Sequence, residues 1–128
     1  MALKYHNPKT VALAGKYALG CEAPAGARLL FVAGQVGLDG NGKLADGIEA
    51  QCEQVWKNIG EVLKAGGMDF RDIVKLTVFL TDSRFIPAFR EVRGKYVGQE
   101  PYPASTLLVV AGLADPSMLV EVEVTAAK

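Results

Sequence analysis

Apolar residues recur along the chain with two alternating periods. Between residues 46 and 65 they are spaced by 4, 3, 4 and 3 positions, the period of one face of an α-helix. Gly66 and Gly67 follow as a stop signal for that helix. From 72 to 80, apolar and polar residues alternate, which predicts a strand covered on one side. The chain therefore combines helices with strands.

A second helical period follows Asp82 and Ser83, either of which could cap the helix, and reaches Tyr96. Shorter apolar runs predict strands, and a segment rich in turn residues at 37–42 predicts a hairpin turn. These strands cover residues 16–22, 28–36, 105–110 and 118–126. Because the helices fall between groups of strands, we expect an α+β fold rather than a wound parallel sheet. The 128 residues fit one domain, 1–128.

The charge balance excludes several classes of partner. Lysines plus arginines number 14, as do aspartates plus glutamates, so the formal net charge is zero. A general nucleic-acid binder would show a basic excess, and so would a protein that binds anionic membranes. We therefore expect neither nucleic acid nor membrane as a partner. Zero net charge opposes self-association only weakly, and half of the residues are apolar, which favours an oligomer.

The two cysteines, Cys21 and Cys52, are too few and too far apart for a disulfide scaffold. The N-terminal residues lack the apolar core of a signal peptide, and no run approaches the roughly 20 apolar residues of a membrane span. We therefore expect a cytoplasmic protein with reduced thiols. His6 is the only histidine, and no partners at metal-ligand spacing surround it, so no metal site is expected.

Two patterns could carry chemistry. Gly37 and Gly42-Lys43 match part of a phosphate-binding loop, but the next residue is Leu44 instead of serine or threonine, which favours a simple turn. Glu121 and Glu123 lie two residues apart in an expected strand and therefore share one face. They could be a solvated surface or a pair for acid–base catalysis, and the pattern alone leaves both open.

Several segments together resemble the RidA/YjgF family of imine/enamine deaminases. Their order and spacing, more than any single one, carry the resemblance, which covers nearly the whole chain. The segments are Lys16-Tyr17, 32–36 (VAGQV), 48–51 (IEAQ), 74–82 (VKLTVFLTD), 103–107 (PASTL) and 119–127 (LVEVEVTAA).

The resemblance implies a chorismate-mutase-like fold, in which two helices pack on one face of a mixed sheet. It also implies a homotrimer that binds a small molecule in a cleft at each subunit interface. Deaminases of this family hydrolyse reactive imino or enamine acids to keto acids and ammonia, and they need no metal or organic cofactor. Ribonuclease activity has been ascribed to relatives, but the balanced charge of this chain gives that role no support.

The family's site residues carry over unevenly. Glu121 corresponds to the glutamate that positions the attacking water, and Tyr17 to the family's tyrosine. The backbone of Gly34 would face the ligand, and the main chain of Thr106 would line the cleft. A cleft asparagine is replaced by Arg90, which could bind an anion from the other wall or could be an ordinary exposed helix arginine.

The arginine that clamps the substrate carboxylate is the main departure. The family's P-x-R-S region reads Tyr102-Pro103-Ala104-Ser105, and no arginine follows Arg93. Each charged hydrogen bond of such a clamp is worth roughly 1.5–3 kcal/mol, so its loss should weaken binding of a 2-imino acid by a few orders of magnitude. Two functions remain open. One is an imine or enamine hydrolase with altered specificity, because Ala104 replaces the arginine. The other is a non-catalytic trimer that binds a small molecule or regulates a partner.

Overall fold

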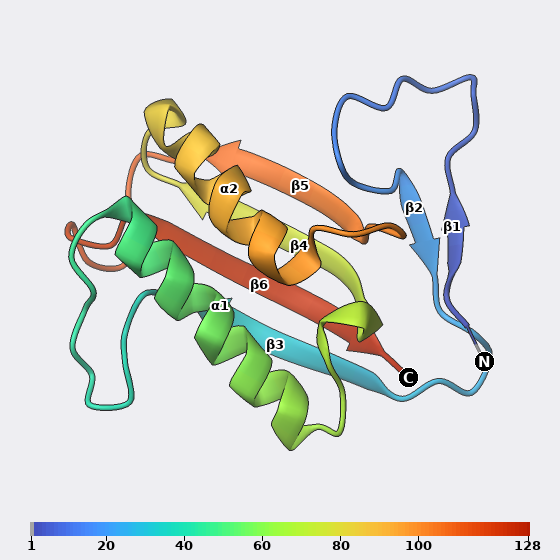
Figure 1. Cartoon of the computed structure of the whole chain (residues 1–128), viewed down its shortest axis with the longest axis horizontal. Helices are drawn as coiled ribbons and strands as arrows, with labels where there is room; N and C mark the ends of the chain where they lie inside the picture. Colours follow the sequence, from blue (N-terminus) through green and yellow to red (C-terminus); the bar gives the residue numbers. More distant parts are fainter. Residues whose placement is uncertain (1) are drawn as a thin grey trace.

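The computed structural model describes residues 2–128, and its centre is a four-stranded mixed sheet with two helices on one face (Figure 1). The α+β fold and the placement of both helices on one face are thus confirmed. The strands, in spatial order, are β3 (Leu29–Gln35), β6 (Val120–Ala127), β4 (Ile73–Leu80) and β5 (Ala104–Val109). The helices are α1 (Ile48–Ala65) and α2 (Ile86–Val97).

Strand β5 runs parallel to β4, whereas β6 is antiparallel to both β3 and β4. The last two strands of the chain are therefore not neighbours, because β4 lies between them. The segment β4–α2–β5 is a crossover unit, in which α2 carries the chain back so that β5 can start beside the start of β4. Periodicity predicted these strands but not their order in the sheet.

Alternate residues of the strands face the helices and form the core. On β6 these are Val120, Val122 and Val124, which are buried as the alternation with Glu121 and Glu123 predicted. Trp56 of α1 is fully buried against this layer, where its ring stacks on that of Tyr96 at 5.8 Å between centroids. The Trp56 ring also lies beside Phe89 of α2, so its aromatic contacts join the two helices, whereas packing of this side chain on the sheet was expected.

Local signals set the ends of the helices. Gly47 precedes α1 with φ 85°, a left-handed conformation that favours glycine. Asp82 accepts a hydrogen bond from the backbone N–H of Arg84 and so caps the short 3-10 helix η2 (Ser83–Phe85) that leads into α2. Neither Asp82 nor Ser83 caps α2 itself, whose N-cap is Phe85 without a side-chain hydrogen bond. A second 3-10 helix, η1 (Phe70–Asp72), precedes β4.

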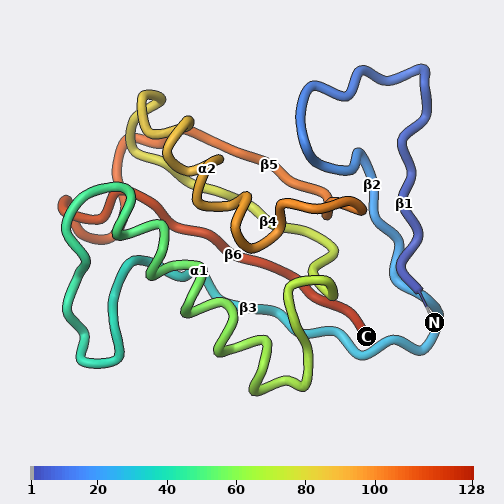
Figure 2. Tube along the Cα trace, in the orientation of Figure 1, coloured from blue at the N-terminus to red at the C-terminus, as the bar shows by residue number. Residues whose placement is uncertain are grey.

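The N-terminal part of the chain forms a separate two-stranded ribbon, β1 (Lys4–His6) with β2 (Gly20–Glu22). Between these strands the chain makes a long loop that projects away from the sheet (Figure 2). The strand expected over 16–22 is therefore shorter, because Lys16 and Tyr17 belong to this loop. Ala18 returns to the sheet and bridges Ala104 at the start of β5.

Neither helix of the described residues is long and apolar enough to cross a membrane.

Candidate functional site

The carboxylate of Glu121 lies directly over Gly34. A Cβ atom placed on Gly34 would come within 2.9 Å of the Glu121 carboxyl carbon and would overlap its Oε2 atom. The approach occurs at a bulge, since β3 has one residue more than β6 between the pairs Val32–Val124 and Gln35–Val122. The structure therefore brings together two predicted site residues that are far apart in the sequence, and it shows why position 34 has no side chain.

The end of the sheet at which β6 starts is held by a buried amide. Gln51 of α1 is 2% exposed, and its Nε2 donates hydrogen bonds to the carbonyls of Ala45 and Ser117. Its Oε1 accepts one from the N–H of Leu119. Because Leu119 immediately precedes β6, these three bonds fix the start of the strand that carries Glu121. Gln51 is thus a positioning residue for the candidate site.

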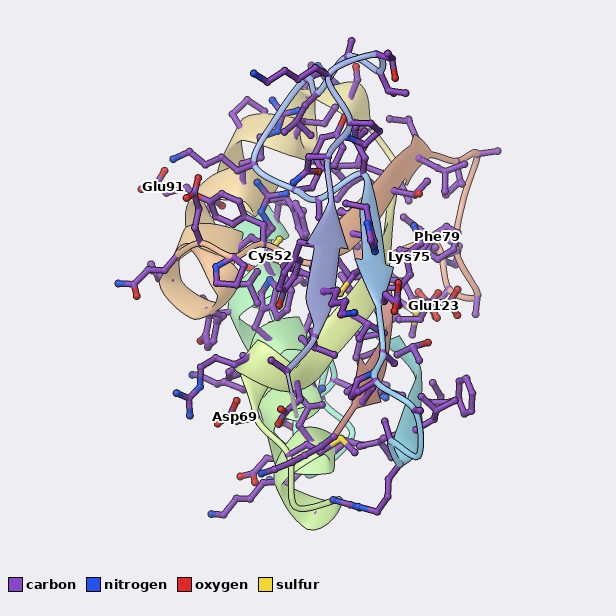
Figure 3. The ribbon with its side chains drawn as sticks, turned by 90° about the vertical axis from the view of Figure 1, so that its right-hand side faces the viewer. Cys52, Asp69, Lys75, Phe79, Glu91 and Glu123 are labelled. Atoms are coloured by element: carbon purple, nitrogen blue, oxygen red, sulfur yellow. The ribbon has the colours of Figure 1, made fainter. Side chains whose placement is uncertain are left out.

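The sheet face opposite the helices carries a second polar group. Lys75 of β4 donates a 2.5 Å hydrogen bond from Nζ to the hydroxyl of Thr106. Lys75 also lines a hollow of about 290 Å³ with Thr77 and Glu123. Figure 3 shows Lys75 and Glu123 on the opposite side of the sheet from Cys52 of α1. Burial lowers the pKa of Lys75, since neighbouring residues remove water from its ammonium group.

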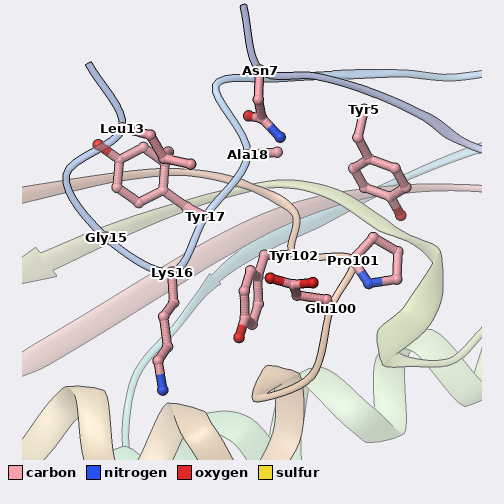
Figure 4. Close-up of a pocket in the computed structure, with 10 residues that line it drawn as sticks. All are labelled: Tyr5, Asn7, Leu13, Gly15, Lys16, Tyr17, Ala18, Glu100, Pro101 and Tyr102. Atoms are coloured by element: carbon pink, nitrogen blue, oxygen red, sulfur yellow. The ribbon is translucent and has the colours of Figure 1, made fainter. Parts of the chain in front are cut away.

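Tyr17 lies in the N-terminal loop, beside a pocket of about 590 Å³ between this loop and the segment 100–102 (Figure 4). Its hydroxyl accepts a hydrogen bond from the N–H of Ala14 at 3.4 Å. The neighbouring Ala18 donates its N–H to the carbonyl of Pro103, which anchors this end of the loop to β5. Tyr17 is thus placed beyond the start of β5.

Arg90 is exposed on α2 and lines a different pocket, of about 490 Å³. The pocket also contains Lys16 of the N-terminal loop, together with Arg93 and Tyr102. Burial lowers the pKa of Arg93, and the nearby charge of Arg90 lowers it further. Arg90 therefore belongs to a group of cations, a grouping that the sequence did not reveal.

The predicted residues form two groups within one chain. Gly34 and Glu121 meet near the start of β6, in register with Phe79 of β4. Tyr17 lies near Ala104, which pairs with Lys75 at the other end of β4. Along β4, Lys75 and Phe79 are four residues or about 13 Å apart, and this distance separates the two groups of site residues. One copy of the chain does not bring Tyr17 and Glu121 together.

Three cationic residues near these groups were missed as site candidates: Lys16, Lys75 and Arg93. Lys75 could have been identified from the sequence, because it is a lysine on the polar face of an otherwise apolar strand. Lys16 and Arg93 could not, since only the tertiary fold brings the N-terminal loop to α2.

Among residues 2–128, no group of three or more His, Cys, Asp or Glu side chains could hold a metal ion. At Gly34, Glu121 supplies a carboxylate on the open face of the sheet. Such a group can accept a proton from water and orient the water's oxygen toward a neighbouring electrophile.

Comparison with known proteins points to one family. The family model described as Endoribonuclease L-PSP matches residues 9–128. The 2-iminobutanoate/2-iminopropanoate deaminase of Mus musculus is 40% identical over 101 residues, which are 77% of this chain and 73% of the relative. The putative regulator AldR of Lactococcus lactis is 39% identical over 100 residues, or 77% and 78% of the two chains.

Solved structures agree with the sequence comparison. The conserved Rid family protein YyfB from Yersinia pestis superposes with a TM-score of 0.85 at 30% identity, and the match covers 100% of both chains. RidA from the Antarctic bacterium Psychrobacter gives a TM-score of 0.73 at 33% identity over 90% of each chain. The chain therefore belongs to the RidA/YjgF family, the one the matching model describes as Endoribonuclease L-PSP.

Proposed function

We propose that this protein hydrolyses reactive imine or enamine intermediates, a 2-imino acid or a related imine, to the keto compound and ammonia. The observation that carries the proposal is the Glu121 carboxylate lying over the bare backbone of Gly34. Relatives at 36–40% identity from mouse and human are named 2-iminobutanoate/2-iminopropanoate deaminases, which supports the same chemistry here. We expect the protein to act in the cytoplasm and without a metal or organic cofactor.

The reaction requires one water and one proton acceptor. Glu121 accepts a hydrogen bond from the water and takes its proton as the oxygen attacks the imine carbon. The C=N bond becomes a C–N single bond, and the proton passes to that nitrogen. The resulting carbinolamine expels ammonia and leaves a C=O bond. An imine hydrolyses readily, so positioning of the water and the substrate is the main contribution asked of the protein.

We place the active cleft between copies of the chain in a homotrimer. The separation of Tyr17 from Glu121 supports this arrangement, because a neighbouring copy could supply the missing half of the site. The open face of the sheet supports it as well. Phe31 is 72% exposed there, Leu29 is exposed on the same strand, and Leu108 is exposed on β5 at the other edge of the sheet. An apolar face of this kind is typical of a surface that another chain covers. In the trimer, the main chain of Thr106 would line the cleft.

The substrate of this chain should differ from that of its named relatives. Ala104, the residue that replaces the family's arginine, lies opposite Lys75 at the start of β5. It cannot make the two parallel hydrogen bonds that a guanidinium makes with a carboxylate. We therefore propose a preference for imines that lack a carboxylate, or that are held through a charge elsewhere in the cleft.

The test is to generate imines in situ with an amino-acid oxidase and trap them with semicarbazide. We expect the wild-type protein to lower the semicarbazone yield for at least one imine, and Glu121→Gln to abolish this effect. Glu123→Gln is the matched control, because it makes the same change on the same face two residues away and should retain activity. The deaminase proposal fails if the wild-type protein never lowers the yield over a broad range of imines.

A second pair of variants tests the role of the arginine. Ala104→Arg places a guanidinium on the Lys75 side of β5, and Ser105→Arg places one on the opposite side, since successive residues of a strand point to opposite faces. A gain of 2-iminobutyrate hydrolysis by either variant would show that the remaining site is intact and that only specificity has changed. The absence of any gain would favour a remodelled pocket.

One named relative keeps the non-catalytic alternative open. The Lactococcus lactis protein is called a putative regulator, at 39% identity. A regulatory trimer would bind a small molecule without turnover. Evidence for that function would be that a metabolite raises the thermal stability of both the wild type and Glu121→Gln, while neither protein consumes an imine.

A further inference from the structure

A pocket of about 490 Å³ lies between the N-terminal loop and α2, and its charged residues are mostly cationic. Lys16 comes from the loop, whereas Arg90 and Arg93 are three positions apart on α2 and so are neighbours on its surface. In Figure 4 the Lys16 side chain extends from the loop toward α2, past Tyr102. Three cations from two separate segments thus converge on one cavity.

Within residues 2–128, none of these three cations lies within ion-pair distance of a carboxylate. The other arginines adjoining α2 and β4 are different: Arg84 pairs with Asp82 and Arg71 with Asp69. The only carboxylate that lines the pocket is that of Glu91.

The three cations outnumber the single carboxylate of Glu91, so the lining of the cavity has an excess of positive charge. Arg93 is half-buried, and its pKa is lowered by loss of water and by the neighbouring Arg90 charge. Two guanidinium groups side by side repel each other unless an anion lies between them. The carboxyl end of α2 also adjoins the pocket and adds a small negative potential, which is less than the charge of the three cations.

Gly94 adds open space to one wall of this cavity. It lies inside α2, where glycine is less favourable than alanine. Its φ is not positive, and a Cβ atom placed on it would meet no atom within 4 Å. The packing of this chain therefore does not require glycine here. Its absent side chain keeps the wall of the pocket open beside Arg90 and Arg93.

We propose that the cavity formed by Lys16, Arg90, Arg93 and Gly94 binds a small anion with two negative charges, either a phosphate group or a dicarboxylate. Each planar guanidinium can donate two parallel hydrogen bonds to such an anion, and the lysine adds a third positive charge from the loop. Tyr102 lines the same cavity and offers a phenolic hydroxyl as a further donor. Bound anion would join the N-terminal loop to α2.

Within one copy of the chain neither Gly34 nor Glu121 lines this cavity, although Arg90 was expected in the substrate cleft, and the binding test does not use imine hydrolysis. The test is direct binding to the full-length protein, measured by calorimetry at constant ionic strength. The probes are inorganic phosphate and succinate, with acetate as a matched single-charge anion. The nitrogen-15 resonances of the arginine side chains identify which guanidinium groups respond.

We expect saturable binding of phosphate, succinate or both, at one site per chain and at least about tenfold tighter than acetate, because a second charge engages a second guanidinium. Binding of phosphate alone would identify the ligand as a phosphate group, and binding of succinate alone would identify a dicarboxylate. Arg90→Gln and Arg93→Gln should each weaken binding at least about tenfold, the loss of a charge-assisted pair. Gly94→Glu should abolish it, since it adds a carboxylate to the cavity.

Arg84→Gln is the control. It removes the same charge from an exposed arginine just before α2 that does not line the cavity, and it should bind like the wild type. The proposal is overturned if neither dianion binds saturably, or if Arg84→Gln weakens binding as much as Arg93→Gln does. Trp56 fluorescence and circular dichroism show that each variant is folded, so a loss of binding can be assigned to the cavity.

Discussion

The two faces of the four-stranded sheet are made by the same strands, yet they differ in almost every physical respect. The face toward α1 and α2 is apolar and closed: Leu76 is 1% exposed, and Val78, Val120 and Val122 are fully buried. The other face mixes exposed apolar residues such as Phe31 with charged ones such as Lys75 and Glu123. Only this open face, at Gly34, holds a carboxylate against bare backbone.

The comparison shows that alternation along a strand gives neighbouring residues different roles. One set of residues stabilises the fold, and the set between them remains free for chemistry and assembly. Since each strand contributes to both faces, a substitution and the same kind of substitution one residue later should have unrelated effects. Four predictions test this division, ordered from the largest expected effect to the smallest.

Leu76→Ala should cause the largest loss of stability. It removes buried methyl groups from the closed face and leaves a cavity, which typically costs about 2–5 kcal/mol of unfolding free energy. Thr77→Ala, one residue later on the open face, should cost less than about 1 kcal/mol. Urea denaturation measures both. Similar losses for the two variants would contradict the division between the faces.

Phe31→Asp should affect assembly instead of folding. Phe31 is exposed in one chain, so the free energy of unfolding of a single copy should change little. In the proposed trimer an unpaired charge would be buried at the interface, at a cost of about 3 kcal/mol, which raises the dissociation constant about a hundredfold. Sedimentation velocity measures this shift. The control is Val11→Asp, at an exposed apolar residue in the N-terminal loop, which should leave the association unchanged.

Gln51→Ala tests the link between the core and the open face. It removes three hydrogen bonds and leaves the backbone groups of Ala45, Ser117 and Leu119 without these partners, at a cost of about 1–3 kcal/mol. Imine hydrolysis should fall as well, because the start of β6 carries Glu121. Gln54→Ala removes one bond, to Asn58 on the same helix, and serves as the control. Full activity in Gln51→Ala would exclude the positioning role.

The smallest effect concerns the pH dependence of stability. Burial raises the pKa of Cys52 from 9.0 to about 12, with smaller contributions from Glu49 and Glu53. Between pH 9 and pH 12 the Cys52 thiol is therefore neutral in the folded protein, whereas it is ionised in the unfolded chain. This contribution is fully present below pH 9 and is lost as the pH rises toward 12, at no more than about 1.4 kcal/mol per pH unit.

Thermal unfolding between pH 8 and pH 10.5 measures this slope. Cys52→Ala should flatten it, whereas Cys21→Ala should change it less, because Cys21 lies half-buried in the N-terminal ribbon. An unchanged slope in Cys52→Ala would assign the alkaline loss of stability to other groups.

Much of the fold could be predicted from the sequence, because period and burial coincide in α1, β4 and β6. The alternation from Val120 to Val124 indicated the correct buried face, and the spacing in α1 indicated its core side. The order of the strands could not be predicted in this way. Period does not encode which strands are neighbours, so the parallel pairing of β5 with β4 followed only from the structure.

The candidate site was less accessible to sequence reasoning. Glu121 and Gly34 were named through a family resemblance, but their contact depends on a bulge in β3 that no periodic pattern reveals. The cavity with Lys16 and Arg93 depends on the path of the N-terminal loop, of which only the part from Lys16 on was expected to be a strand. Contacts between distant segments depend on tertiary packing, so they cannot be predicted from the local sequence.

The bulge at Gly34 has a consequence for how this protein can vary. Any side chain at position 34 would occupy the space of the Glu121 carboxylate, so the size of one residue limits the other across 87 positions of the chain. A side chain at position 34 is therefore expected to be tolerated only together with a smaller residue at position 121.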